Sequence, residues 1–319
     1  MPCTRARCFY FCILGAGVIC CSACSFFGSA ATLEQLSSAA LPRHSLVSGV
    51  PVLAQSENQC GPAALAMLLQ WGGDPVDPSE LSPSMYAAIP QGTFTFDFVG
   101  AARRRGALVI PYQASPESLT AEIASGNPVV ALINKGLSWV PAWHYVVVSG
   151  YDLDGDSVVF HAGEATAERL PFAIFWQLWS RSDFWMAVVL PPRRLSATAS
   201  RQQHYDALLA LERIELWEAA GRGYSAALQR WKDDRDLLFS RAHVLYRRGL
   251  LSEAESDLRL LLSKEPEYAP ALNNLAQILA ERGKKEEALK LAGSALSLGG
   301  EYRESYERTL REIQSASKP

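Results

Sequence analysis

The chain has 319 residues, enough for two modest domains that each bury a core of their own. Its 30 basic and 33 acidic residues nearly cancel, which argues against a nucleic-acid partner. Six of the seven cysteines precede residue 25, so Cys60 stands alone in the rest of the chain.

Residues 1–24 have the pattern of an export signal. Two arginines precede an apolar run of about 13 residues, 9–21, which is shorter than a membrane-spanning helix needs. The small residues before Cys24 resemble a bacterial lipobox, although Cys21 stands where that pattern usually has leucine. Ordinary signal cleavage after Ala31 is the alternative. We expect an exported protein of the periplasm or outer membrane, held to the membrane by a lipid on Cys24 alone.

Residues 25–48 show no strong period and are predicted to be a tether. In an oxidising compartment disulfides are favoured, yet the body of the chain offers Cys60 no second cysteine. An unpaired thiol in such a place is either deeply buried or reactive.

Residues 49–192 change from a helical to a β pattern along the chain. Apolar spacing predicts helices over 61–71, 96–105 and 115–124. Runs rich in β-branched residues predict antiparallel strands over 128–133, 145–149, 157–160 and 185–190. The aspartate-rich segment 152–156 fits a hairpin turn better than a calcium loop. The aromatic run 175–185 fits a core better than a substrate groove. We expect an α+β domain in which a helix precedes an antiparallel sheet.

Residues 193–203 are predicted to be a linker, and residues 204–315 are helical and repetitive. Two segments align without gaps at a period of 34 residues, with Gly249 and Ala254 matched by Gly283 and Ala288. That period, with small residues where helices cross, is typical of tetratricopeptide repeats. A shorter, degenerate copy precedes them. We expect an all-α solenoid that binds a protein partner; a helical tail packed on the first domain is the alternative.

The stretch Cys60-Gly61-Pro62 places a thiol at the start of the first predicted helix. Amide hydrogens at a helix N-terminus stabilise a thiolate, which is the nucleophilic form of cysteine. Gly61 allows close approach, and Pro62 suits the first helical turn. The competing interpretation is a small buried residue before a helix.

A nucleophilic thiol also needs a base within hydrogen-bond reach. Of the five histidines, His144 and His161 fall in the β half of the domain, and His144 opens the predicted strand HYVVVSGY. A zinc site at Cys60, His144 and His161 is a further alternative, but close-spaced ligand pairs, which typify zinc sites, are lacking. We expect no cofactor and no metal.

The segments QCGPAALAMLL and WHYVVVSGYD resemble the C39 and C39-like cysteine peptidases, bacterial members of the papain-like superfamily. The resemblance covers about residues 50–190, and a subset of such proteins joins an export leader to a tetratricopeptide tail, as here. It implies that Cys60 is the nucleophile and His144 the general base. It also implies that the side-chain amide of Gln55, with the Cys60 backbone N–H, stabilises the oxyanion; Gln59 fits this role less well.

The third catalytic position departs from the family pattern, which usually has aspartate there. The strand SVVFHAGE places His161 at that position, and Asp152 is the other candidate to orient His144. The resemblance implies an exported thiol hydrolase that cleaves a peptide or amide bond through a thioester, acting on a peptide or protein substrate. The alternative is a catalytically weak, peptidase-like scaffold that works through its repeats in the cell envelope.

Overall fold

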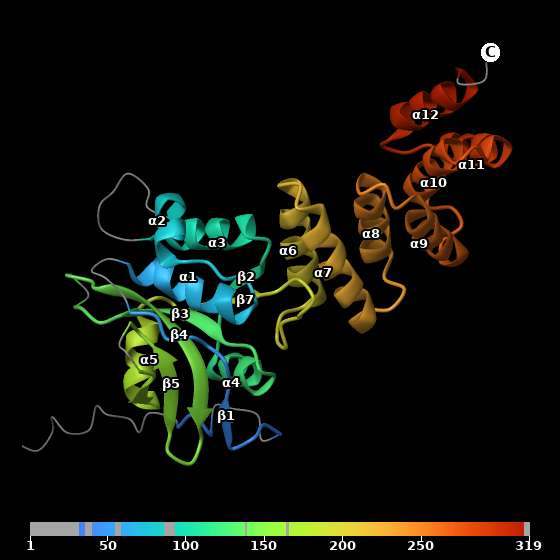
Figure 1. Cartoon of the computed structure of the whole chain (residues 1–319). Coiled ribbons are helices and arrows are strands. Elements are labelled where there is room, and N and C mark those ends of the chain that lie inside the picture. Colours follow the sequence, from blue (N-terminus) through green and yellow to red (C-terminus); the bar gives the residue numbers. More distant parts are fainter. Residues whose placement is uncertain are drawn as a thin grey trace, which may run out of the picture.

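A computed structural model of the chain describes residues 32–35, 40–54, 59–85, 93–137, 139–163 and 166–315. An α+β domain comes first and a row of helices follows it (Figure 1). Both the α+β class of the first part and the helical second part are as predicted from the sequence. Across the described part of the chain, none of the helices has both the length and the apolar character that a membrane span requires.

One antiparallel sheet organises the α+β domain. Its strand order in the described residues is β2-β7-β3-β4-β5-β6, and β1 also pairs with β4. The strands are β1 (His44–Leu46), β2 (Leu108–Gln113), β3 (Val129–Asn134), β4 (Trp143–Asp152), β5 (Ser157–His161), β6 (Glu168–Pro171) and β7 (Trp185–Leu190). The long strand β4 pairs along its first part with β3, and beyond Val148 with β1.

Side chains on the strands alternate between two separate cores, as the period of a β-strand dictates. Val129, Ala131 and Ile133 of β3 face one core, whereas Val130 and Leu132 face the other. Three helices cover the second face: α1 (Cys60–Trp71), α2 (Pro78–Met85) and α3 (Thr95–Arg104). Helices α4 (Pro116–Ala124) and α5 (Phe172–Ser180) cover the first (Figure 1).

Helix α1 is buried along most of its length, because α2 and α3 cover the side that does not contact the sheet. Its residues from Gly61 to Leu69 are all buried. The helix ends at the Gly72-Gly73 pair, where Gly73 has a φ of +94°. Burial of this kind fixes the first residue of α1, Cys60, relative to the sheet.

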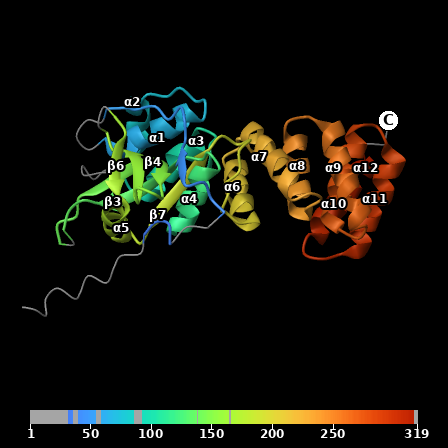
Figure 2. The same ribbon diagram turned by 90° about the horizontal axis from the view of Figure 1, so that it is seen from below.

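The C-terminal helices pair as expected for repeats. They are α6 (Arg201–Arg213), α7 (Trp217–Arg230), α8 (Arg235–Arg247), α9 (Leu251–Lys264), α10 (Ala269–Glu281), α11 (Lys285–Leu298) and α12 (Arg303–Ser315). Gly249 and Gly283, one period apart, have φ values of +75° and +76° just after α8 and α10. The recurring glycine thus closes the first helix of each of these pairs. The row extends away from the α+β domain (Figures 1 and 2).

Several boundaries differ from the sequence-based prediction. His44–Leu46, which we expected in the tether, forms β1 and joins the sheet. The predicted linker is not a free connection, because Ser196 is fully buried and α6 already begins at Arg201. Strands β2 and β6 and helices α2 and α5 were not predicted. The aromatic run is core, as favoured: Phe175 and Trp179 are completely buried.

Candidate active site

Cys60 is the first residue of α1, where the helix begins without a side-chain cap. Gln59 precedes it, and its carbonyl accepts the first helical hydrogen bond, from Ala63 N at 3.0 Å. The side chain of Gln59 is held elsewhere, since its Oε1 accepts from Ser82 Oγ at 2.8 Å. The thiol is half-buried and is free of any disulfide.

Backbone N–H groups of Tyr145, Gly61 and Cys60 itself lie near enough to the sulfur to act on its pKa. These donors, and the positive charge of Lys135, favour the thiolate, but burial opposes them more strongly and raises the pKa of Cys60 above that of an ordinary thiol. The N–H groups at the helix N-terminus do favour the thiolate, as the sequence predicts, but their effect is smaller than that of burial. The site at rest therefore favours the neutral thiol.

His144 lies on β4 next to Tyr145, the residue whose backbone N–H faces the sulfur. Its Nε2 forms a hydrogen bond 2.9 Å long to the carbonyl oxygen of Ala162. A carbonyl can only accept, so Nε2 carries the proton and Nδ1 is left with a lone pair. Burial, and to a lesser degree the charge of Lys135, lower the pKa of His144. His144 is thus a neutral base with a defined tautomer.

The structure brings Cys60 and His144 to the same corner of the sheet through Tyr145. Among the hydrogen bonds of the described residues, none joins the Cys60 sulfur to a ring nitrogen of His144. Resting sites of this type often tighten only when substrate binds. Burial disfavours the charged form of both the thiol and the imidazole in this arrangement.

Among the described residues, neither predicted orienting residue forms a hydrogen bond with the His144 ring. Nε2 of His161, which is buried, lies 3.1 Å from Ser149 Oγ. Asp152 lies at the far end of β4, where its carboxylate binds His44, Arg169 and the Gly155 N–H. In this structure the hydrogen-bond partner of the His144 ring is the Ala162 carbonyl, and the role of His161 or Asp152 as orienting residue stays a prediction.

The position of Ala162 follows from the pairing of β4 with β5. Val147 pairs with His161, and the register shifts between Val148 and Gly150. This bulge leaves Ser149 as the extra residue, and its hydroxyl meets His161. The end of β5 is thereby fixed beside His144. A β-bulge has no sequence signal that we could have used.

Lys135 is the site residue that sequence reasoning missed. It follows β3 immediately, and its backbone N–H binds the Ala142 carbonyl at 2.9 Å. Because Ile133 pairs with His144, the hairpin register brings Lys135 near both Cys60 and His144. The signal available in the sequence was a lysine, Lys135, two residues after Ile133, which is the residue that pairs with His144.

Two predicted site residues, Gln55 and Cys24, lie outside the described residues. The predicted oxyanion donor and lipidation site therefore stay predictions. The Cys60 backbone N–H, the other predicted oxyanion donor, does lie at the helix N-terminus beside the sulfur.

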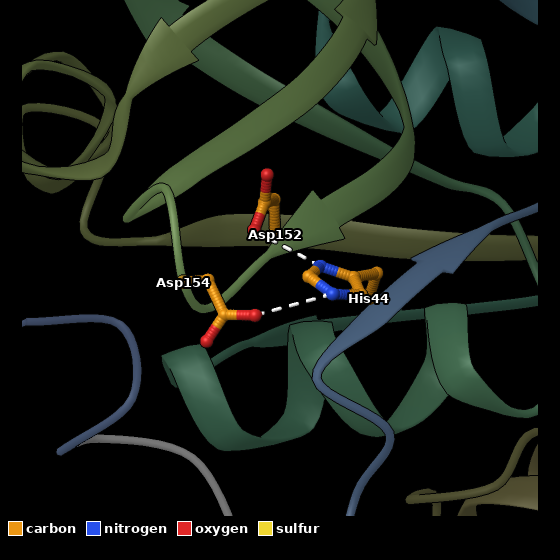
Figure 3. A group of neighbouring side chains, drawn as sticks. All are labelled: His44, Asp152 and Asp154. Carbon is orange, nitrogen blue, oxygen red and sulfur yellow. Dashed lines mark hydrogen bonds and ion pairs between the residues drawn. The ribbon is translucent and has the colours of Figure 1, made fainter.

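In the described part of the chain, one group of side chains has the composition of a metal site: His44, Asp152 and Asp154 (Figure 3). His44 Nδ1 lies 3.0 Å from Asp152, and Nε2 lies 3.1 Å from Asp154. The two carboxylates thus face different nitrogens of the ring. Arg43 and Arg169 already pair with these aspartates. The group is an ion-pair cluster that joins β1 to the β4–β5 turn.

Comparisons with known proteins match two parts of the chain. The model of the "Peptidase_C39 like family" matches residues 47–181. A TPR repeat-containing protein of Pseudomonas aeruginosa is 32% identical over 96 residues, which are 28% of this chain and 16% of that protein. The chain therefore matches only a small part of that relative.

Three solved structures resemble parts of the chain at low identity. A C39-like peptidase from Bacillus anthracis is 20% identical, with 48% of this chain and 98% of that chain covered and a TM-score of 0.40. The peptidase domain of Streptococcus ComA is 20% identical, with 45% and 99% covered and a TM-score of 0.38. The Sgt2 TPR domain from Aspergillus fumigatus is 19% identical, with 38% and 86% covered and a TM-score of 0.34. Residues 47–181 thus match the C39-like peptidase family, and helices that pair in the manner of tetratricopeptide repeats follow them.

Proposed function

We propose that the protein is an exported thiol hydrolase that cleaves a peptide or another amide bond. The observation that carries the proposal is the corner formed by Cys60 and His144. The sulfur faces backbone N–H groups at a helix N-terminus, and the neighbouring imidazole has its tautomer set by the Ala162 carbonyl. A C39-like domain supplies the context.

The proposed reaction begins with proton transfer from the Cys60 thiol to Nδ1 of His144 as the sulfur attacks the substrate carbonyl. The resulting oxyanion accepts hydrogen bonds from the Cys60 N–H and, in our proposal, from the Gln55 side chain. The imidazolium then protonates the leaving amine, which leaves a thioester. Water, deprotonated by His144, hydrolyses the thioester and restores the thiol.

Among the described residues, the hydrogen-bond partner of the His144 ring is a backbone carbonyl and not a carboxylate, which has a kinetic consequence. A backbone carbonyl orients the imidazole but stabilises the imidazolium less than an aspartate does. We therefore expect turnover to be slow relative to peptidases with a complete triad. The same observation favours the alternative function, a catalytically weak scaffold whose repeats bind a cell-envelope partner.

Hydrolysis of a pooled peptide library, followed by mass spectrometry, separates the two functions. The hydrolase proposal predicts cleavage that is lost in Cys60→Ala and reduced at least about a hundredfold in His144→Ala, the usual scale for a general base. If neither variant changes the products, or if Cys60 forms no acyl adduct with an activated ester, the enzyme proposal is wrong and the scaffold remains.

Export and a lipid on Cys24 are also proposals, supported by the sequence of residues 1–24. In bacteria that express the chain, the mature protein should be found in the membrane fraction, with a mass that includes acyl chains. Cys24→Ala should remove both properties. An unchanged mass and fractionation in that variant would show that Cys24 is not acylated.

A further inference from the structure

A groove of about 580 Å³ lies between the two domains, away from the Cys60 corner. The α+β domain contributes Arg104 and Arg105 at the end of α3, and the helical region contributes Arg222 of α7 and Arg248 after α8. The glutamates that line it are Glu215 and Glu218. We call it the arginine groove. It is locally positive in a chain whose net charge is −3.

The four arginines of the groove differ in how their charge is balanced. Arg105 binds Asp74, with Nε 2.7 Å from Oδ2, and Arg222 pairs with Glu218. Within the described residues, the hydrogen bond of Arg104 goes to the backbone carbonyl of Ser84, at 3.1 Å. Across the described residues, neither Arg104 nor Arg248 forms an ion pair. Two exposed guanidinium groups in the groove therefore have no ion-pair partner of their own there, although the charge of Arg248 also acts on Glu218, which pairs with Arg222.

The charge gathers here because three helices end at this junction. Basic residues occupy the last turns of α3, α6 and α8, where they offset the helix dipoles. Their convergence leaves Arg103 with a buried Nε that has no partner in the described structure. Burial and the nearby charge of Arg213 lower the pKa of Arg103.

The groove also has an apolar wall, formed by Pro192, Leu216 and Trp217. The indole of Trp217 is half-buried, and the guanidinium of Arg247 lies 4.3 Å from its ring centroid. A ligand that fills this space needs carboxylates for the arginines and an apolar group for the wall. The volume is in the range of ligand clefts and is too large for a single small anion. Its concave shape does not fit a flat lipid surface.

We propose that the arginine groove binds an acidic segment of a polypeptide. Carboxylates of the segment pair with Arg104 and Arg248, since guanidinium forks bind carboxylates in a bidentate manner. An apolar side chain of the segment packs against Trp217. Because the groove is built by both domains, a bound polypeptide contacts the C39-like domain and the repeats together. The proposal does not depend on cleavage by Cys60.

Fluorescence anisotropy tests the proposal with the full-length chain carrying Cys60→Ala, so that no probe is cleaved. The probe is a labelled decapeptide of glutamates with one central tryptophan, and the reference peptide has glutamines instead. We expect the acidic peptide to bind and the glutamine peptide to bind at least about tenfold more weakly. Replacing both free arginines, as Arg104→Gln with Arg248→Gln, should also weaken binding of the acidic peptide about tenfold.

The matched control is Arg308→Gln with Arg311→Gln, which removes two exposed arginines from α12 at the far end of the row. It should leave the affinity unchanged. Equal affinities of the groove and control variants, or of the two peptides, would overturn the proposal. So would binding to vesicles rich in phosphatidylglycerol that depends on the groove arginines while the acidic peptide does not bind. Thermal melts establish that each variant is folded.

Discussion

At the scale of single residues, the candidate site disfavours a thiolate–imidazolium pair between Cys60 and His144 before substrate binds. Burial raises the pKa of the Cys60 thiol and lowers that of the His144 imidazole, so each shift favours the neutral form. The Cys60 thiol is therefore activated only during the reaction, when its proton passes to the His144 ring as the sulfur attacks the substrate carbonyl. Lys135 acts on both groups, because its charge favours the thiolate and disfavours the imidazolium.

Replacing Lys135 should move both titrations in the same direction. In Lys135→Gln the thiolate loses a favourable charge and the imidazolium loses an unfavourable one, so the pKa values of Cys60 and His144 both rise. Alkylation of Cys60 by iodoacetamide should shift to higher pH, and its rate at pH 7 should fall about two- to fivefold, the scale of an exposed charge interaction. The pH dependence of alkylation measures the shift. Lys232→Gln, an exposed lysine after α7, is the control; an equal shift there, or none in Lys135→Gln, contradicts the argument.

The nucleophile and base were predictable from residue type and position, whereas their partners were not. The sequence places Cys60 before a helix and His144 at the start of a strand. The Ala162 carbonyl could not be foreseen, because it reaches His144 only through the bulge at Ser149 and the register of β5. Backbone acceptors carry no side-chain signature. His161 and Asp152 were the side chains that sequence position offered, and both are bound elsewhere.

At the scale of elements, Gly61 determines how closely the segment before α3 approaches the start of α1. A Cβ built on Gly61 would lie 2.5 Å from Thr93 Oγ1 and 2.7 Å from Thr93 Cβ. A rotamer change of Thr93 moves the hydroxyl but not the Cβ. The Thr93 carbonyl also accepts a hydrogen bond from the Tyr145 hydroxyl at 3.1 Å. The contact of Gly61 with Thr93 thus joins α1, α3 and β4 at the candidate site.

Gly61→Ala should consequently destabilise the fold, by about 1–3 kcal/mol, which is typical of overpacking a buried contact. Urea unfolding measures the change. Adding Thr93→Gly to Gly61→Ala should recover part of the loss, and a double-mutant cycle isolates this coupling. Gly293→Ala is the matched control, since a Cβ there meets nothing within 4 Å in the middle of α11. It should be neutral or stabilising. A Gly61→Ala variant as stable as the parent would show that the site is looser than described.

The element pattern of the chain was predictable where periods were long or regular. Helices α1, α3 and α4 and strands β3, β4, β5 and β7 were expected within a few residues of their bounds. Strand β2 contains Pro111, which weakens a strand pattern, and helix α2 contains Pro83, which weakens a helical one. Helix α5 consists mostly of large apolar residues, whose period is hard to distinguish from that of a buried strand. These elements are fixed by tertiary packing.

At the scale of the whole molecule, the two domains share one core. The cluster that includes Val148 of β4 continues through Leu208 of α6 and Tyr224 of α7 to Val244 of α8. A Cβ on Gly223 would lie 2.1 Å from Leu208, so α6 and α7 approach closely at this glycine. The sequence predicted a linker here because prolines and small polar residues are typical of one. That composition did not indicate that the segments before and after residues 193–203 pack against each other in one core.

The buried carboxylate of Glu122 on α4 holds the connection between the domains. It accepts hydrogen bonds from Ser196 Oγ, from the N–H groups of Ala197 (3.1 Å) and Thr198 (2.9 Å), and from Asn127 Nδ2 (2.7 Å). Its side chain is fully buried. Removing it would leave several buried donors without an acceptor, and each unsatisfied group costs free energy. The residue thus couples the C39-like domain to the repeats.

Glu122→Ala should therefore lower the free energy of unfolding by about 3 kcal/mol or more. It should also expose residues 193–200 to limited proteolysis. The parent chain should lose its α+β domain and α6–α8 in one transition, because their core is continuous, whereas the variant should show two. Urea unfolding followed by tryptophan fluorescence and by circular dichroism measures both effects.

The control is Glu117→Ala, on the exposed side of the same helix, which should lower the free energy of unfolding by no more than about 1 kcal/mol. A parent chain that unfolds in two steps, or a Glu122→Ala variant as stable as Glu117→Ala, would mean that the domains are joined by the chain alone.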